Sequence, residues 1–159
     1  MKKLRHLITL FFVFFIWTSA NAAKMDIIQV ASDNKDFSIF ISLLKKADLI
    51  NVLKGHGPFT IFAPSNEAFE AVPKEQLNAL IANPEQLKVM LLYAIVSDNL
   101  TSDKIKEGML PTAQGQSLHV IIKDSKIYVN DAEVIKADIK ASNGVIHAIS
   151  QVLMPPEQE

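Results

Sequence analysis

Histidine is the side chain in this sequence best suited to acid–base or metal chemistry, and it occurs four times, at positions 6, 56, 119 and 147. None stands in the His-Glu-x-x-His or His-x-His spacing that presents two imidazoles to one zinc ion. There is no cysteine to act as nucleophile or ligand, no Gly-x-Ser-x-Gly elbow and no phosphate-binding glycine loop. The sequence therefore predicts a protein that is not an enzyme, with no catalytic residue, cofactor or metal ion.

Two of these histidines allow two interpretations each. His56 stands between two glycines, so it is either an exposed contact on a loop or a turn residue whose neighbours supply unusual backbone angles. His147 lies in an alternating run, on the face opposite Ile146 and Ala148. It is either a pH-sensitive surface group or a structural histidine with a satisfied hydrogen bond. We favour the turn for His56 and the structural role for His147.

The first 22 residues have the composition of an export signal. Three basic residues precede an apolar run from Leu7 to Trp17, and Ala20-Asn21-Ala22 places small residues where a signal peptidase cleaves. The apolar run is shorter than the roughly 20 residues that a membrane-spanning helix needs, which favours a cleaved signal peptide, residues 1–22, over an uncleaved anchor. We expect one mature domain, residues 23–159, that is periplasmic or secreted and has no membrane span after cleavage.

The mature segment is weakly acidic. Without the leader it keeps 13 basic and 17 acidic residues, a net charge of −4. Nucleic acids and anionic membrane surfaces attract the opposite charge, so neither is an expected partner. Since the chain has no cysteine, no disulfide supports the fold, and the apolar core of a single domain must stabilise it.

The first half of the mature chain has helical periodicity. Four apolar residues recur at spacings of three and four, as on one face of a helix: Phe37, Phe40, Ile41 and Leu44. A short helical turn over residues 49–53 should end at Gly55. Asn83 can cap a further helix that begins with Pro84, a position where a missing amide proton costs nothing.

The second half is rich in β-branched residues and predicts two hairpins. Their strands are residues 117–123 with 126–130, and residues 134–141 with 145–149. Asp124-Ser125 forms the first predicted turn and Asn143-Gly144 the second, because Asn-Gly is a strong hairpin signal. Helices followed by a meander of strands predict an α+β fold, with helices packed on antiparallel strands.

Residues 57–69, with the sequence GPFTIFAPSNEAF, combine a strand, a proline and a helix start. Strand alternation gives two pairs that face opposite ways: Phe59 with Ile61, and Thr60 with Phe62. Aromatic rings on both faces indicate a strand buried on both sides and not a surface for stacking a ligand. Ser65 can cap the helix that follows.

This segment resembles the first signature of the fasciclin domain, an extracellular adhesion and interaction module. Residues 143–149, NGVIHAI, and 152–156, VLMPP, resemble the closing signature of that family, so the resemblance spans essentially the whole mature chain. It implies a compact wedge of two mostly antiparallel β-sheets flanked by several helices. It also implies structural roles for the motif residues Thr60, Phe62, Pro64, Asn66, Phe69, Asn143, Gly144 and His147. We expect Asn66 to fix the corner between strand and helix through backbone hydrogen bonds.

The resemblance also indicates candidate partner-binding residues: Tyr93, Asp138 and Ile139. Tyr93 matches a Tyr-His pair associated with integrin contacts in matrix members, although Ala94 replaces the histidine. Asp138-Ile139 resembles an Asp-Ile pair of integrin-binding members; otherwise it is a strand-edge aspartate beside a buried isoleucine. Ser150 stands where the family has an aspartate, and together with Ala94 it suggests the joint loss of a buried polar interaction.

The sequence therefore predicts an exported, non-enzymatic interaction module for cell-surface, matrix or host adhesion. Its partner would be a protein or a surface glycan, bound through exposed loops and strand edges. The alternative is a periplasmic protein that binds a small molecule or lipid in an apolar cleft between helices and sheet. Monomer and oligomer are both compatible with the sequence.

We predict that the mature chain begins at Ala23, because alanine occupies both positions that a signal peptidase recognises at 20–22. The intact mass of protein purified from the cell envelope or the medium should correspond to residues 23–159. A mass that still includes Met1 and the leader would contradict cleavage and favour the uncleaved anchor.

Overall fold

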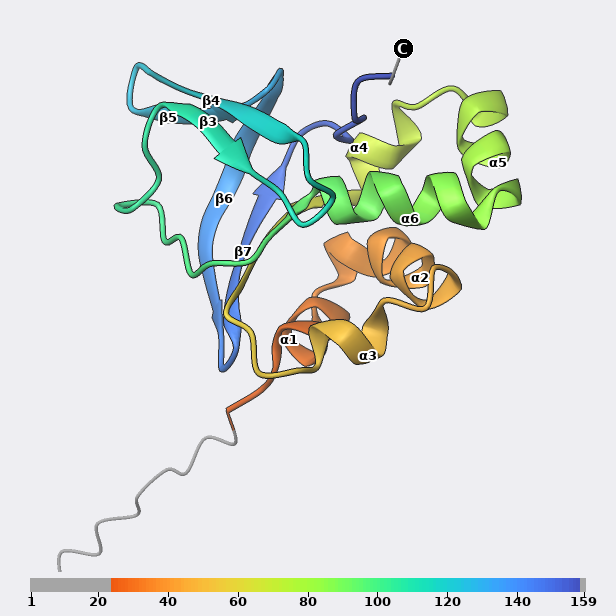
Figure 1. Ribbon diagram of the computed structural model, residues 1–159, viewed down its shortest axis with the longest axis horizontal. Coiled ribbons are helices and arrows are strands. Elements are labelled where there is room, and N and C mark those ends of the chain that lie inside the picture. The colour runs from red at the N-terminus through yellow and green to blue at the C-terminus, as the bar shows by residue number, and fades with distance from the viewer. Residues whose placement is uncertain (1–23, 158–159) are drawn as a thin grey trace, which may run out of the picture.

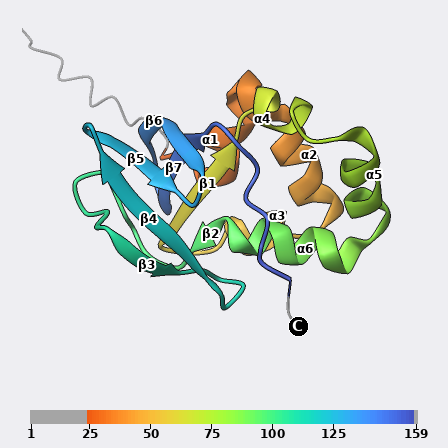
Figure 2. The ribbon, with the colours of Figure 1, turned by 90° about the horizontal axis from the view of Figure 1, so that it is seen from above.

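The computed structural model describes residues 24–157, so the predicted signal peptide lies outside the described residues. The helices gather at one end of the molecule and the strands at the other (Figure 1). Figure 2 shows the same division from above, with the strands curving around one side of the molecule. No helix among residues 24–157 is long and apolar enough to cross a membrane.

The helical end contains, within the described residues, six α-helices and one 3₁₀ helix. Their bounds are α1 Ile27–Asp33, η1 Lys35–Phe37, α2 Ser38–Lys46, α3 Ile50–Leu53, α4 Asn66–Glu70, α5 Lys74–Ala82 and α6 Pro84–Tyr93. The apolar spacing predicted α2, and the side chain of Asn83 caps α6 as expected. Sequence analysis missed α1, whose start is fixed by a capping box between Asp26 and Gln29.

Seven strands form one sheet in the order β2-β1-β7-β6-β5-β4-β3. Their bounds are β1 Phe59–Pro64, β2 Ile95–Val96, β3 Gly108–Pro111, β4 Ser117–Lys123, β5 Lys126–Val129, β6 Ala132–Ala141 and β7 Gly144–Ile149. The pairing of β1 with β7 is parallel, and the other pairings are antiparallel. Both predicted hairpins are present, as β4–β5 and β6–β7.

The α+β class is therefore correct, but the predicted wedge of two sheets is not confirmed. The long strand β6 joins both halves, because it pairs with β5 at Ala132 and Glu133 and with β7 from Val134 onward. Shifts of register along β6 bend the sheet there. At the far edges, the N–H of Ala113 donates to the carbonyl of Ile95 (2.7 Å), so the sheet curls until it is nearly a barrel.

Glycine is required in the second hairpin but not in the first. Asp124 and Ser125 both have positive φ, 53° and 62°, as the predicted tight turn requires. In the second hairpin Ala141 pairs with Gly144, so Gly144 already belongs to β7 and the turn lies one residue earlier than predicted. A side chain at Gly144 would overlap the carbonyl of Phe59, which explains why glycine is required there.

The central strands separate two apolar clusters. One cluster lies between the sheet and the helices and includes Ile61, Ala63 and Ile146. The other lies inside the curled sheet and includes Phe62 and Ile149. The prediction that β1 is buried on both faces is confirmed, and β7 is buried along its whole length.

Phe62 provides a test of this core. We predict that Phe62→Ala lowers the free energy of unfolding by roughly 3–5 kcal/mol, because the ring is fully buried and its removal leaves a cavity. Urea denaturation measures the loss. His56→Ala is the control, and it should cost about 0.5 kcal/mol or less since His56 is exposed. Equal midpoints for Phe62→Ala and the parent chain would contradict this assignment of the core.

Candidate functional site

His147 lies at the centre of β7 and is 0% exposed. Its ring stacks on Phe62, with ring centroids 5.6 Å apart. Nδ1 accepts a hydrogen bond from the backbone N–H of Asp138 (3.2 Å), so the ring proton sits on Nε2, which donates to the carbonyl of Leu100 (2.6 Å). Both ring nitrogens are satisfied inside the protein, which supports the structural interpretation and not the pH-sensitive surface.

Thr60 is the second polar side chain buried at this point of the sheet. Its hydroxyl donates to the carbonyl of Asp98 (2.6 Å) and accepts the N–H of Leu100 (2.8 Å). Thr60 and His147 therefore hold the same few residues of the segment 97–107, which we call the β2–β3 loop. The two side chains fasten this loop onto the sheet from β1 and β7.

Asp138 holds the β2–β3 loop from the other side. It lies at a bulge in β6, with φ 60°, and its carboxylate accepts both the backbone N–H (2.7 Å) and the hydroxyl (2.5 Å) of Ser102. Ile139 is half-buried and packs against the cluster beneath the helices. Both oxygens of the candidate partner-binding aspartate are thus bonded within the chain.

Burial and hydrogen bonding set the protonation of this network. Burial lowers the pKa of His147 below its ordinary value, against the opposing effects of the Leu100 carbonyl and the Asp138 carboxylate. Partial burial would raise the pKa of Asp138, but the hydrogen bonds from Ser102, together with His147 and Lys140, hold it below its ordinary value. A neutral imidazole and an ionised carboxylate are therefore the stable pair.

Tyr93 and Ala94, from the middle signature, are 2% and 3% exposed. The Tyr93 hydroxyl donates to the carbonyl of Ser117 (3.2 Å) and accepts from the side-chain amide of Asn130 (3.1 Å). These bonds join the end of α6 to β4 and to the turn after β5. The Tyr93 side chain supports the sheet and does not reach the surface.

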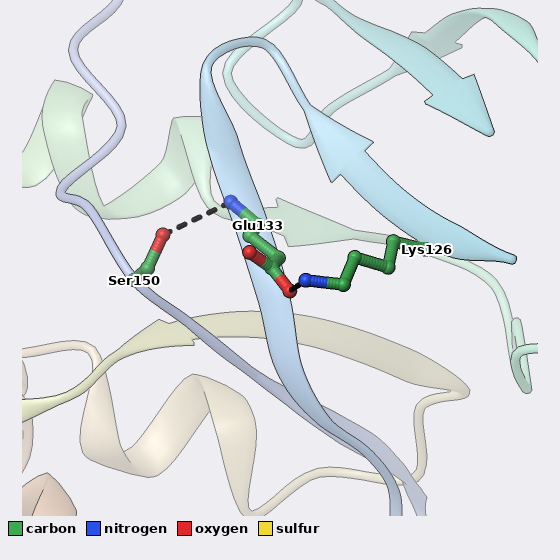
Figure 3. A network of polar contacts seen from close by, with 3 residues as sticks. All are labelled: Lys126, Glu133 and Ser150. Carbon is green, nitrogen blue, oxygen red and sulfur yellow. Dashed lines mark hydrogen bonds and ion pairs between the residues drawn. The ribbon is translucent and has the colours of Figure 1, made fainter. Parts of the chain in front are cut away.

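Ser150 forms its hydrogen bonds with β6 (Figure 3). Its hydroxyl accepts the N–H of Glu133 (3.0 Å), and its own N–H donates to the Glu133 carbonyl (2.9 Å). The Glu133 carboxylate in turn pairs with Lys126 at 2.9 Å. Ser150 therefore extends the β6–β7 pairing, and neither of these bonds involves Ala94, with which the sequence suggested the joint loss of a polar interaction.

Asn143 and Asn66 connect segments that are far apart in the sequence. Asn143 accepts the N–H of Ile27 (2.8 Å) and donates to the carbonyls of Leu53 (2.8 Å) and Gly55 (2.7 Å). Asn66 accepts the N–H of Ile39 (3.1 Å), so it reaches across to α2 instead of fixing its own strand–helix corner. That corner is held by Ser65, whose hydroxyl accepts from Ala68, while Pro64 and Phe69 are buried around it.

An exposed surface lies on the opposite side of the strands from the inner cluster. Residues that pair across neighbouring strands point to the same face of the sheet. On β3–β6 the following residues share one face, which we call the outer sheet face: Met109, His119, Ile121, Tyr128 and Glu133. Met109 is 69% exposed and Ile121 is 41% exposed. Sequence analysis missed this surface, although the alternation of buried Leu118 and Val120 with exposed neighbours in β4 is its signal.

A groove of about 760 Å³ lies between α5 and α6 on one side and Gln114, Gln116 and residues 154–157 on the other. It is lined by glutamines, two glutamates and a few aliphatic side chains. The other two histidines among residues 24–157, His56 and His119, are exposed and lie far apart in the sequence. Among the described residues, no cluster of three or more His, Asp or Glu side chains could hold a metal ion.

Comparison with known proteins places this arrangement in a family. Residues 35–155 match the family model of the Fasciclin domain, well over half of the chain, and the chain therefore belongs to the fasciclin domain family. Protein sll1483 of Synechocystis sp. is 41% identical over 140 residues, which are 87% of this chain and 78% of that protein.

Two further similarities concern longer proteins. Transforming growth factor-beta-induced protein ig-h3 of Sus scrofa is 38% identical over 149 residues, 93% of this chain but 21% of that protein. A FAS1 domain pair from the insect cell adhesion molecule Fasciclin I has the same fold, with a TM-score of 0.68 at 18% identity, over 82% of this chain and 51% of that chain. This chain thus spans about a fifth of ig-h3 and about half of the insect domain pair.

The buried histidine predicts an acid-sensitive fold. His147 has its pKa lowered from 6.5, so the unfolded chain binds this proton more readily, and stability falls as the pH drops from about 6.5 towards the lowered value. The slope should be at most about 1.4 kcal/mol per pH unit for one proton. Urea denaturation between pH 7.5 and 5 measures it. His147→Gln should flatten the slope and His119→Ala should keep it; an unchanged slope in His147→Gln would contradict the assignment.

Proposed function

We propose that the mature chain, residues 23–159, is an exported, non-enzymatic interaction domain that attaches to a protein or surface glycan of a cell surface, matrix or host. It acts in the periplasm or outside the cell. Membership of the fasciclin domain family supports this proposal, as does the fold shared with an insect protein described as a cell adhesion molecule. Its weak acidity and the scattered positions of its histidines support it further.

The outer sheet face is the observation that carries the proposal. Three polar side chains form their hydrogen bonds within the chain: Thr60, His147 and Asp138. In contrast, the large apolar side chains of Met109 and Ile121 are exposed. Met109 on the edge strand β3 and Ile121 on β4 are suited to a partner that lies across this face and along the start of β3, before that edge meets β2 at Ala113. The partner is therefore bound through strand edges and adjoining loops.

Tyr93, Asp138 and Ile139 contribute to this function indirectly. Tyr93 holds the first residue of β4 and the turn after β5, and Asp138 holds the β2–β3 loop. Ile139 anchors the β6 bulge on the core beneath the helices. All three keep the outer sheet face and its edge in shape for the partner.

Met109→Glu tests the proposal. Vesicles made from the cell envelope of the organism that produces the protein are passed over surfaces coated with the parent chain or the variant. The coating density needed to retain the same number of vesicles should be at least about tenfold higher for the variant, because a charge replaces an exposed apolar contact. Val52→Glu, at a residue of α3 that is 57% exposed, is the matched control and should retain vesicles like the parent chain. Equal retention by parent and Met109→Glu, with unchanged melting temperatures, would overturn the role of the outer sheet face.

A further inference from the structure

The groove between the helices and the C-terminal segment, which we call the glutamine groove, is rich in glutamine. Four glutamines line it, two from the helices and two from the loop before β4: Gln76, Gln86, Gln114 and Gln116. Leu80, Met90 and Met154 supply apolar contacts between them. Figure 2 shows the C-terminal segment passing beside α6, where it forms one wall. A volume of about 760 Å³ falls within the range of ligand-binding pockets.

The loop wall is held firmly by its own hydrogen bonds. Thr112 donates to the carbonyl of Gln116 from both its N–H (3.1 Å) and its hydroxyl (2.6 Å), and the Gln114 side chain accepts the N–H of Gln116 (3.0 Å). The Gln116 side-chain amide reaches the carbonyl of Pro156 across the groove (3.5 Å). The two glutamine side chains are thus oriented before any ligand binds.

Gln116 also carries a buried acceptor that the chain does not satisfy. Its Oε1 is buried and accepts no hydrogen bond from the described residues. Buried polar atoms are almost always paired, because an unpaired one loses its hydration without replacement. Because this oxygen has almost no accessible surface, it gains a ligand donor only when the Gln116 side chain turns toward the groove.

The acidic side chains of the groove favour a positively charged hydrogen-bond donor. Glu85 and Glu157 line it, and no lysine or arginine is among the described residues that do. Of the residues that the structure describes, no aromatic one lines the groove, so these residues offer no stacking partner to a flat ring. Glutamine amides offer both donors and acceptors, which match the alternating N–H and C=O groups of an extended peptide backbone.

We propose that this groove binds an extended peptide segment of a protein partner, with its backbone held by the glutamine amides and a lysine or arginine side chain held by Glu85 and Glu157. The proposal deepens the proposed interaction function and rests on it, because it supplies a second contact surface and the chemistry of the segment that fits it. The groove and the outer sheet face are built from different residues, so each can be altered alone.

Arrays of short peptides test the proposal. One array has Lys or Arg fixed at the centre, and a matched array has Glu there; both are probed with labelled full chain purified from its host. The Lys/Arg array should capture the chain and the Glu array should not. The best binder is then titrated in solution by fluorescence anisotropy. Equal capture by both arrays, or by neither, would overturn the proposal.

Single substitutions in the groove test whether the peptide binds there. Val89→Arg places a cation in the groove and should weaken the best peptide by about tenfold or more, whereas Val52→Arg, exposed on α3, is the matched control and should leave its affinity unchanged. Gln116→Met removes a side-chain amide from the groove wall, together with its bond to Pro156, so it should also weaken the peptide. Unchanged affinity in both groove variants would overturn the proposal.

Met109→Glu separates this proposal from the broader one. It alters the outer sheet face and should leave the affinity for the peptide unchanged. If vesicle attachment depends on Met109 while no peptide binds the groove, the groove proposal alone fails. If a Lys/Arg peptide binds the groove while Met109→Glu attaches normally, the groove proposal stands and the outer sheet face is not the attachment surface.

Discussion

The parallel pairing of β1 with β7 is the interaction on which the rest of the structure depends. It runs in register from Phe59 opposite Gly144 to Pro64 opposite Ile149, and it separates the two apolar clusters. At its open end Asn143 accepts the first amide of α1 and also donates to carbonyls at and after the end of α3. Because both strands are buried on both faces, neither can shift without exposing an apolar cluster to water.

The same strand pair determines where polar groups are buried. Thr60 and His147 point from neighbouring strands toward one loop, and Asp138 fixes the loop from the β6 bulge. The motif residues that are typical of the family thus mainly stabilise the fold. In our proposals, partner choice falls to side chains outside the motifs, on the outer sheet face and along the glutamine groove.

Local patterns predicted α2, α6 and both hairpins, because spacing, caps and turn pairs are signals carried by neighbouring residues. The parallel pair and the bonds of Asn143 join distant segments, up to 116 residues apart for Ile27, and periodicity carries no signal for them. Asp138 resembled a strand-edge contact in sequence, since nothing local indicates that a bulge turns its carboxylate onto Ser102. The surface grooves likewise arise from elements that meet only in the folded chain.

The position of β7 has a consequence for biosynthesis. β7 is the last strand of the described residues, yet it lies third in the sheet, between β1 and β6. While the ribosome is still making residues 144–149, β1 has no parallel neighbour and the apolar faces around it stay exposed. The domain therefore cannot fold piece by piece from its N-terminus, and its long-range pairing makes folding a late and slow event. A nascent chain of this design keeps apolar surface exposed until synthesis has passed β7, and exposed apolar surface promotes aggregation in that interval.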